Sequence, residues 1–432
     1  MLDRIKALRD RPWTVALILA IAAQLLFAFH LDQPGRLMFD EVHYVPAAHA
    51  LLDLEGPRNI EHPLLGKELI AAGIVLLGDN PLGWRVFPSL AGTASVLAIF
   101  AFLWLLLGSM RTAVVGALLA CVNQSVYVQA RTAMLDVFLG AFLLWGLVLM
   151  LWAMKGAGRQ VWRRWIAGAA LLGLATAVKW SAIPYVALAG LAFLVIRVRD
   201  ARIAKKPLAA ALSGKDQPHW AGLPAIPALL LLGLVSIAAY FVTFAPAFFY
   251  TYSPLDLPGL FRQQWEMYAL QTQKLPHHNY QSDWWSWPLM IRPIWFFYEW
   301  DDGAQRGVLL IGNPLVMWGG LLAVLACCWA WFRDKAIRPF ATALLWIASL
   351  AIYVVIPKSL GFYYYYHLSG LFICIVLAAA FHHFDRGKGR GREEWFVAAA
   401  FLVFVYFYPI LSAAPLSGQD PYTHWMWFDS WR

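Results

Sequence analysis

The sequence predicts an all-α membrane protein that crosses the bilayer about eleven times, and three observations support this fold class. The 432 residues are 61% hydrophobic and only 14% charged, whereas soluble domains carry about 25% charged residues. Apolar stretches close to the length of a membrane span recur along the whole chain, as in polytopic membrane proteins. The basic residues lie mainly in short segments outside these stretches.

Eleven apolar segments are the expected spans, and two longer polar segments interrupt them. The expected spans are residues 13–30, 83–107, 112–129, 134–154, 165–178, 181–196, 223–244, 307–332, 339–356, 361–383 and 395–411. The polar segments are residues 31–82, where the sequence favours a helix over 41–52, and residues 245–306. No internal repeat or soluble domain is evident, so residues 1–432 are expected to form one membrane domain.

The distribution of charge predicts the orientation of these spans. Most of the 34 Lys and Arg residues lie on the side of the N-terminus, and most of the 25 Asp and Glu residues lie on the other side. The positive-inside rule therefore places the N-terminus in the cytoplasm and the C-terminus on the outer side. Both long polar segments then face the outer side, where ATP and nucleotide sugars are absent. The net charge of +9 reflects this topology and does not indicate a nucleic-acid partner.

Neither a metal nor a redox centre is expected, and the sequence suggests no cofactor. All four cysteines lie inside apolar segments without the spacing of metal ligands, so we interpret them as small hydrophobic residues. They are Cys121, Cys327, Cys328 and Cys374. The adjacent histidine pairs at 277–278 and 382–383 also lack the spacing of known zinc motifs.

The acid pair Asp40–Glu41 is the strongest catalytic candidate. It follows the first expected span and opens the predicted helix over 41–52. Acids at a helix N-terminus stabilise the helix by ~0.3–1 kcal/mol, which is the structural interpretation. The functional interpretation is a general base, because a partly desolvated carboxylate has a raised pKa that suits removal of a hydroxyl proton.

Further polar residues of the first outer segment are candidates for substrate binding. His43 follows the acid pair, and His62 and Lys67 belong to the stretch HPLLGK. We expect these side chains to help bind a polar acceptor or a phosphate. The alternative is an interfacial helix whose lysine extends its ammonium toward water.

Cations near the ends of other spans are candidates for binding a donor phosphate. Arg131 and Asp136 bracket the start of the fourth span, and either they form an ion pair or they take part in function. The other outer cations are Lys179, Arg292 and Lys358. Each of them could be a simple membrane anchor, but together they could hold an anionic head group.

The aromatic stretch GFYYYYH follows Lys358 and contains the candidates Tyr365 and His367. Tyrosines at this depth either form an interfacial belt, stack on a sugar ring or line a groove for a lipid.

Several of these motifs occur in the order seen in a known family. FDEVHY, HPLLGK, GWR and RTAMLD follow one another, and GLATAVKWSAIP, WPLMIRPIWFFYEW and FYYYYH come later. The chain resembles the protein O-mannosyltransferases, which depend on dolichyl- or polyprenyl-phosphate-mannose and belong to the GT-C superfamily. The resemblance implies a GT-C-type helical bundle and inverting transfer of mannose to Ser or Thr of a protein. It also implies a bacterial inner-membrane form without the MIR domain of eukaryotic members, because residues 245–306 are too few to contain one.

The resemblance also implies roles for particular residues. Asp40 matches the acidic catalytic residue of the family. Glu41 matches its neighbour, which helps position a substrate, and Arg131 matches an arginine implicated in donor binding. Two positions depart from the family pattern. Leu64 replaces the second proline of HPPLGK, and Pro357-Lys358-Ser359 stands where Ser-Arg is common, so Lys358 would supply the charge there.

Two other functions are compatible with parts of this pattern. Related GT-C enzymes transfer a lipid-linked sugar to a glycolipid, lipid A or a glycan instead of a protein. A transporter or flippase is a different class, but such proteins tend to show internal repeats and ionisable residues near the bilayer midplane. Here no repeat is evident, and the strongest acids cluster in one outer segment.

Overall fold

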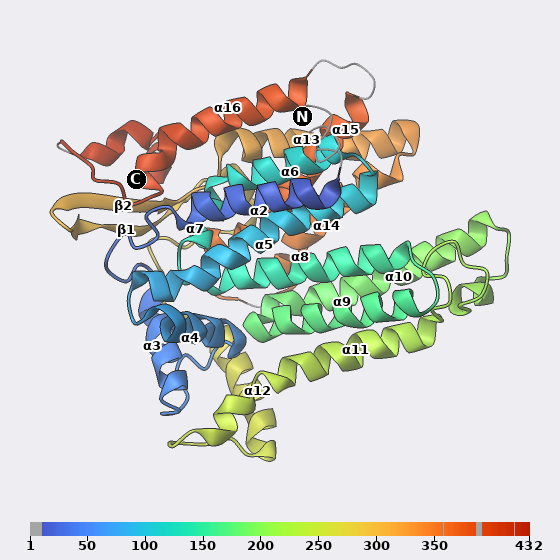
Figure 1. Ribbon diagram of the computed structural model, residues 1–432, viewed down its shortest axis with the longest axis horizontal. Helices are drawn as coiled ribbons and strands as arrows, with labels where there is room; N and C mark the ends of the chain where they lie inside the picture. The colour runs from blue at the N-terminus through green and yellow to red at the C-terminus, as the bar shows by residue number, and fades with distance from the viewer. Residues whose placement is uncertain (1–10, 357, 386–390, 419) are drawn as a thin grey trace.

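The computed structural model describes residues 11–356, 358–385, 391–418 and 420–432, and it confirms the predicted bundle of membrane helices. Each of the eleven expected spans overlaps a helix or a pair of helices, and these run alongside one another in Figure 1. The helices are α2 (Pro12–Ala28), α5 (Pro81–Leu107), α6 (Met110–Cys121) with α7 (Gln124–Ala130), α8 (Leu135–Met154), α9 (Arg159–Val178), α10 (Ile183–Ile203), α11 (Ala225–Val242), α13 (Pro314–Asp334), α14 (Ile337–Val355), α15 (His367–Phe384) and α16 (Arg392–Phe407).

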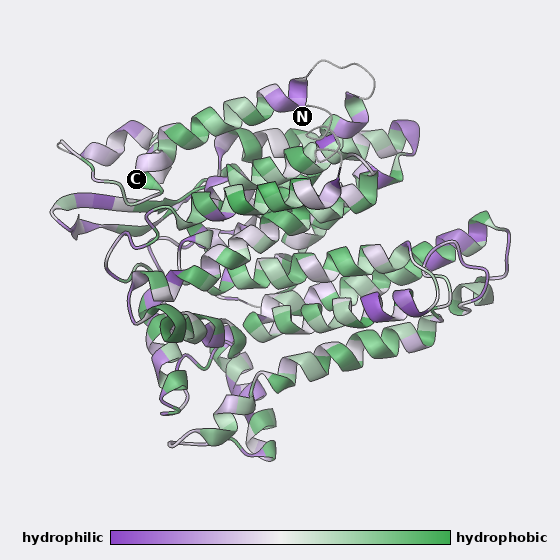
Figure 2. Ribbon diagram, in the orientation of Figure 1, coloured by the Kyte–Doolittle hydropathy of each residue, from purple (hydrophilic) through white to green (hydrophobic). Residues whose placement is uncertain are grey.

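The composition of these helices is that of a multi-pass membrane protein. Within the described residues, eight helical segments are long and apolar enough to cross a membrane, and the bent pair α6–α7 would be a ninth. Apolar residues dominate along the helices, while hydrophilic residues gather near their ends (Figure 2). Helix α15 packs against α13, α14 and α6. It is almost entirely buried, so it forms the centre of this part of the core.

The structure corrects the expected third and eighth spans. The segment 112–129 is not one straight helix, because α6 and α7 meet at 66° around a short break. At this break the side chain of Asn123 donates to the carbonyl of Gly370 at 3.1 Å. The segment 307–332 is helical only from Pro314, where the Asn313 side chain accepts from two backbone N–H groups at the helix start.

Residues 307–310 belong instead to a β-hairpin that the sequence did not predict. Strands β1 (Ile294–Asp301) and β2 (Ala304–Leu310) pair antiparallel. The inner half of the hairpin is buried against the helices, and its tip is held by the first outer segment. Arg36 and Glu299 form an ion pair at 2.6 Å there.

Three helices of the two polar segments lie at one end of the bundle, which is also the end that carries the hairpin (Figure 1). Helix α3 (Glu41–Leu52) has the predicted bounds, and α4 (Leu65–Leu77) follows it in the first segment. Helix α12 (Leu257–Thr272) belongs to the second segment and lies beyond the end of α11. The polar segments are therefore largely helical, and they cover the ends of the spans.

Candidate active site

The two acids of the pair Asp40–Glu41 have different surroundings, and Glu41 is not placed to contact a substrate. Its carboxylate is fully buried and accepts two hydrogen bonds from Arg85, both at 2.9 Å. It also accepts from the backbone N–H groups of Met38 at 3.0 Å and Ala133 at 2.8 Å. Both oxygens tie the first outer segment to α5 and to the start of α8, and these contacts do not support the expected catalytic role of Glu41.

Asp40 is the free member of the pair. Its half-buried carboxylate has no hydrogen-bond or ion-pair partner in the part of the chain that the structure describes. Burial is the main cause that raises the pKa of Asp40 to about 6, and the electrostatic influence of Lys179 and of His43 offsets part of that effect. A carboxylate with this pKa is largely ionised at neutral pH and can still accept a proton, which is what a general base requires.

Lys179 pairs with Asp136 and not with Asp40. The ammonium contacts both Asp136 oxygens, at 2.8 and 3.0 Å, and both side chains are buried. The alternative pair of Arg131 with Asp136 is therefore wrong. Arg131 instead donates to the carbonyls of Phe27 at 2.7 Å and His30 at 2.6 Å. Its guanidinium caps the end of α2, away from Asp136, which does not support the expected contact with a donor phosphate.

A second lysine joins this group through the tyrosine run. Lys358 donates to the hydroxyl of Tyr365 at 3.2 Å, and its ammonium lies 4.9 Å from the centre of the Tyr365 ring. Lys179 lies 4.8 Å from the same ring, so one aromatic side chain contacts both ammonium groups. Burial, followed by the like charge of Lys179, lowers the pKa of Lys358 to about 8.

The two lysines and Tyr365 line a cavity of about 200 Å³. Its walls come from the start of α10, the end of α12, the end of α14 and the loop that follows α14. The remaining lining residues are Trp180, Ser181, Ile183, Pro184, Tyr268, Gln271, Thr272, Tyr353 and Ile356. The cavity thus combines a cationic inner end with apolar walls between two membrane helices, which suits an anion attached to a lipid.

The predicted histidines differ in their positions. His62 is half-buried near the lysines, and its buried Nδ1 has no hydrogen-bond partner among the described residues. Burial and the nearby ammonium groups hold the pKa of His62 well below its usual value, so its ring is neutral. His367 is also buried without a partner for either ring nitrogen in the described chain, and Gly140 leaves the room for it. His43 is exposed next to Asp40.

The structure does not bring two of the other predicted cations to this cavity. Lys67 is buried and donates to the carbonyls of Asn59 at 2.7 Å and His62 at 2.8 Å. Burial lowers the pKa of Lys67 to about 7, and its contacts are those of a residue that shapes the loop before α4. Arg292 donates to the carbonyl of Asn279 at 3.2 Å and to the carbonyls of Ser430 and Arg432, both at 3.3 Å.

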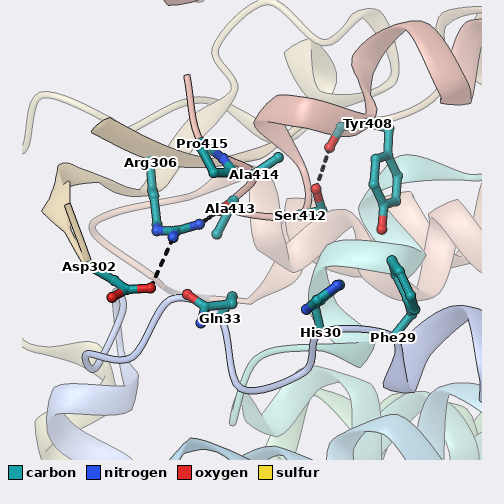
Figure 3. Close-up of a pocket in the computed structure, with 10 residues that line it drawn as sticks. All are labelled: Phe29, His30, Gln33, Asp302, Arg306, Tyr408, Ser412, Ala413, Ala414 and Pro415. Carbon is teal, nitrogen blue, oxygen red and sulfur yellow. Dashed lines mark hydrogen bonds and ion pairs between the residues drawn. The ribbon is translucent and has the colours of Figure 1, made fainter. Parts of the chain in front are cut away.

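A second and larger cavity, of about 410 Å³, lies between the ends of α2 and α16 and the hairpin. In Figure 3, Arg306 extends to Asp302 and to the carbonyl of Ala413, and these contacts are 3.3 and 2.8 Å long. None of the residues predicted for the active site lines this cavity. It is therefore separate from the group of Asp40, Lys179 and Lys358.

Sequence reasoning missed several residues that build the site. Arg85 was visible only as part of the motif GWR, although a buried arginine at the start of a span signals a fixed anionic partner. Tyr268 and Gln271 come from the second outer segment, where no sequence pattern connected them with Lys358. Tyr353 donates from its hydroxyl to the carbonyl of Tyr365 at 3.1 Å, and it lies inside a span that looked uniformly apolar.

The fold resembles that of solved membrane transferases. One similar structure is a chain of the S. cerevisiae protein O-mannosyltransferase Pmt1–Pmt2 complex bound to the sugar donor. The match covers 100% of this chain and 94% of that chain, with a TM-score of 0.81 and 14% identity. ArnT from Cupriavidus metallidurans bound to undecaprenyl phosphate matches 91% of this chain and 64% of its own, with a TM-score of 0.53 and 16% identity. The fold is therefore that of the GT-C glycosyltransferases.

The sequence comparisons identify the family within this class. A family model described as "Dolichyl-phosphate-mannose-protein mannosyltransferase" matches residues 61–214. A second, described as the "C-terminal four TMM region of protein-O-mannosyltransferase", matches residues 257–431. Together the two models cover more than half of the chain. The chain belongs to the protein O-mannosyltransferase family, and it is a mannosyltransferase.

Two curated relatives cover nearly the whole chain. The polyprenol-phosphate-mannose–protein mannosyltransferase of Mycobacterium tuberculosis (strain CDC 1551 / Oshkosh) is 28% identical over 499 residues, with 98% of this chain and 92% of the relative covered. The protein of the same name from Mycolicibacterium smegmatis (strain ATCC 700084 / mc(2)155) is 27% identical over 501 residues, with 98% and 94% covered. The likeness therefore extends over both outer segments and all the spans.

Proposed function

We propose that this protein transfers mannose from polyprenyl-phosphate-mannose to Ser or Thr hydroxyls of proteins on the outer face of the membrane, with inversion at the anomeric carbon. The observation that carries the proposal is the carboxylate of Asp40, which has no partner among the described residues and is influenced by the charge of Lys179, a residue that lines a cationic cavity with apolar walls. The relatives are named for a polyprenol-phosphate-mannose donor and a protein acceptor, which supports the same pair of substrates here.

In the proposed reaction, the oxygen of the acceptor hydroxyl attacks the anomeric carbon of the mannose. The bond between that carbon and the phosphate oxygen breaks, and the polyprenyl phosphate leaves from the opposite face of the sugar. Asp40 takes the proton of the hydroxyl as the new glycosidic bond forms. A positioned base of suitable pKa typically accelerates such a step by about 10²–10⁴-fold.

The donor phosphate would bind between Lys179 and Lys358. Departure of the sugar leaves a phosphate monoester with more negative charge than the diester had, so cations held in place there stabilise the transition state more than the ground state. The Tyr365 ring, which contacts both ammonium groups, would fix their positions. These lysines replace Arg131 and Arg292 in the proposal, because both arginines are engaged with backbone carbonyls.

The polyprenyl chain would leave the cavity between α10 and α14, where Ile183, Pro184 and Ile356 form apolar walls. His62, His367 and Asp136 would surround the sugar or hold the lysines, and the exposed His43 would face the acceptor. The donor supplies the free energy of transfer, so the proposed reaction needs no cofactor. No group of potential metal ligands occurs among the residues described.

The proposed location is a bacterial inner membrane, with the N-terminus in the cytoplasm and the C-terminus in the periplasm. This topology rests on the unequal distribution of Lys and Arg between the two sides. It puts the ends of the spans that carry α3, α4 and the hairpin in the periplasm, where lipid-linked donors are the available activated sugars.

The test is a transfer assay with the purified protein in liposomes that contain synthetic polyprenyl-phosphate-mannose. We expect a Ser/Thr-rich peptide to gain an α-linked hexose if the donor is β-linked, which is measured by mass spectrometry and by NMR of the anomeric proton. A β-linked product would contradict the inverting mechanism. Transfer to an added glycolipid in place of the peptide would contradict the protein acceptor.

A further inference from the structure

Helix α12 carries an apolar face that no described part of the chain covers. Its side chains Leu257, Phe261, Trp265 and Tyr268 are 68%, 60%, 75% and 49% exposed. They are spaced four, four and three residues apart, which places them on one side of the helix. The side that packs on the protein carries other residues, including the fully buried Met267, so the exposed face is not part of the core.

The exposed face continues the lipid-facing surface of the preceding membrane helix. Helix α11 exposes apolar side chains along most of its length, namely Ile226, Leu230, Leu234, Ile237 and Val242. At its outer end the ring of Phe241 lies 5.7 Å from that of Phe261 on α12. Figure 1 places α12 just beyond this end, at the margin of the bundle. The exposed apolar side chains of α11 and those of α12 therefore lie close together at the outer end of α11.

The residue types of α12 are those of a helix at the lipid–water interface. Trp265 and Tyr268 are the residues enriched at this depth of a bilayer, and the charged residues Arg262 and Glu266 lie on a different, exposed side. An amphipathic helix of this kind lies in the plane of the interface with its apolar face turned to the acyl chains. A lipid surface accounts for both the apolar and the charged exposed sides.

The C-terminal end of α12, including Tyr268 at the end of the exposed face, reaches the donor cavity. Tyr268, Gln271 and Thr272 form one wall of that cavity, and the Gln271 side chain donates to the carbonyl of Glu61 at 2.9 Å. Directly after the helix, the hydroxyl of Ser359 donates to the carbonyl of Gln273 at 2.8 Å. Because Ser359 is next to Lys358, the position of α12 is mechanically connected to one of the two lysines of the cavity.

We propose that the face of Leu257, Phe261, Trp265 and Tyr268 is seated in the outer-leaflet interface, and that this contact holds α12 as the wall of the donor cavity. The partner is the lipid bilayer itself. The inference about the wall rests on the proposed function of the cavity, whereas the contact with lipid does not. Loss of the contact would let the wall move, which weakens admission of a lipid-linked donor without changing the chemistry at Asp40.

The contact with lipid is tested by nitroxide labels at W265C and E266C in liposomes of phosphatidylethanolamine and phosphatidylglycerol. Adjacent exposed positions on two sides of one helix give a matched pair, and the signal of the unsubstituted protein corrects for the native cysteines. We expect the label at 265 to collide several-fold more with oxygen, relative to a water-soluble nickel chelate, than the label at 266. Equal access of the chelate to both labels would overturn the proposal. Protection of the 265 label from both reagents, with dipolar broadening between labels, would show that a second copy covers the face, and would also overturn it.

The wall is tested by the double variant F261S/W265S, with R262S/E266S on the charged side as the control. We expect the KM for polyprenyl-phosphate-mannose in the same liposomes to rise by about tenfold in F261S/W265S, with kcat unchanged and with no change in the control. An unchanged KM would overturn the proposal that contact with lipid holds α12 as a wall of the donor cavity. If the unsubstituted protein transfers no mannose at all, the proposed function fails while the label experiment still decides the contact with lipid.

Discussion

Replacement of Asp40 by Asn tests the central claim about the site, because it removes the base and leaves the shape of the side chain. With a pKa of about 6, Asp40 is about nine-tenths ionised at pH 7. Loss of a positioned base should lower kcat by about 10²–10⁴-fold, which is about 3–5.5 kcal/mol on the barrier. The donor KM should stay within about twofold, because Asp40 contacts neither lysine within ion-pair distance.

The same substitution should not destabilise the protein, and this separates it from a structural defect. The pKa of Asp40 is raised from 3.8 to about 6 mainly by burial, so the charged form is less favourable in the folded state than in the unfolded state. That cost is absent below pH 3.8 and fully present above about pH 6. Asp40→Asn removes the cost at pH 7, so the melting temperature should stay equal or rise.

The measurements are initial rates with synthetic donor and peptide in liposomes, and thermal unfolding of the purified protein in detergent. Asp53→Asn is the matched control, since Asp53 is exposed at the C-terminal end of the same helix α3, and we expect it to leave kcat and KM unchanged. A near-normal kcat of Asp40→Asn would refute the assignment of the base. Asp136 would then be the remaining carboxylate in the group.

Three further variants and the pH profile test the other assignments. In the unsubstituted protein, kcat/KM should rise with pH as Asp40 ionises near 6 and fall as Lys358 loses its proton near 8; a profile without an acid limb near 6 would contradict the role of Asp40. Lys358→Met should raise the donor KM by about tenfold to a hundredfold and abolish the limb near 8, whereas an unchanged KM would remove Lys358 from the phosphate site. Glu41→Ala should lower the free energy of unfolding by about 3–5 kcal/mol, because Arg85 stays buried without its partner; Glu55→Ala on the surface is the control, and equal stability of the two variants would contradict this reasoning. Arg131→Ala should lower the free energy of unfolding by about 3 kcal/mol, because the carbonyls at the end of α2 lose their hydrogen-bond donor. The KM for the sugar donor should stay within about twofold in the folded protein. A raised KM with unchanged stability would restore the role in donor binding that the family resemblance implies for Arg131.

The fold was largely predictable because membrane spans are local in sequence. A run of apolar residues determines a span without reference to distant residues, and the bounds of α3 followed from its position after the acids. The break between α6 and α7 was not predictable, since Asn123 finds its partner Gly370 more than 200 residues away. The hairpin β1–β2 was missed because its residues are apolar in runs and lack the alternation of a half-buried strand.

The site was only partly predictable, because its polar residues are defined by their partners. Asp40 and Glu41 are neighbours with the same chemistry, and only the tertiary contact with Arg85 decides which of them is neutralised. Lys179 and Lys358 come from distant segments, and no local pattern shows that both approach one tyrosine ring. Conversely, the motif around Arg131 resembles that of a donor-binding arginine, but its guanidinium caps the end of α2. No local pattern in the sequence shows that these two segments meet.

The charges of the group explain why one acid must stay free while another is paired. Asp136 neutralises Lys179 at 2.8 Å. Within the residues that the structure describes, Lys358 has no carboxylate partner and Asp40 has no cationic one. In the proposed reaction, Asp40 becomes neutral as it takes the proton, and the leaving phosphate gains one negative charge. The total charge of the site is therefore unchanged while negative charge moves from Asp40 toward the lysines. Fixed cations on that path stabilise the transition state without rearrangement, which a fully paired site would not do.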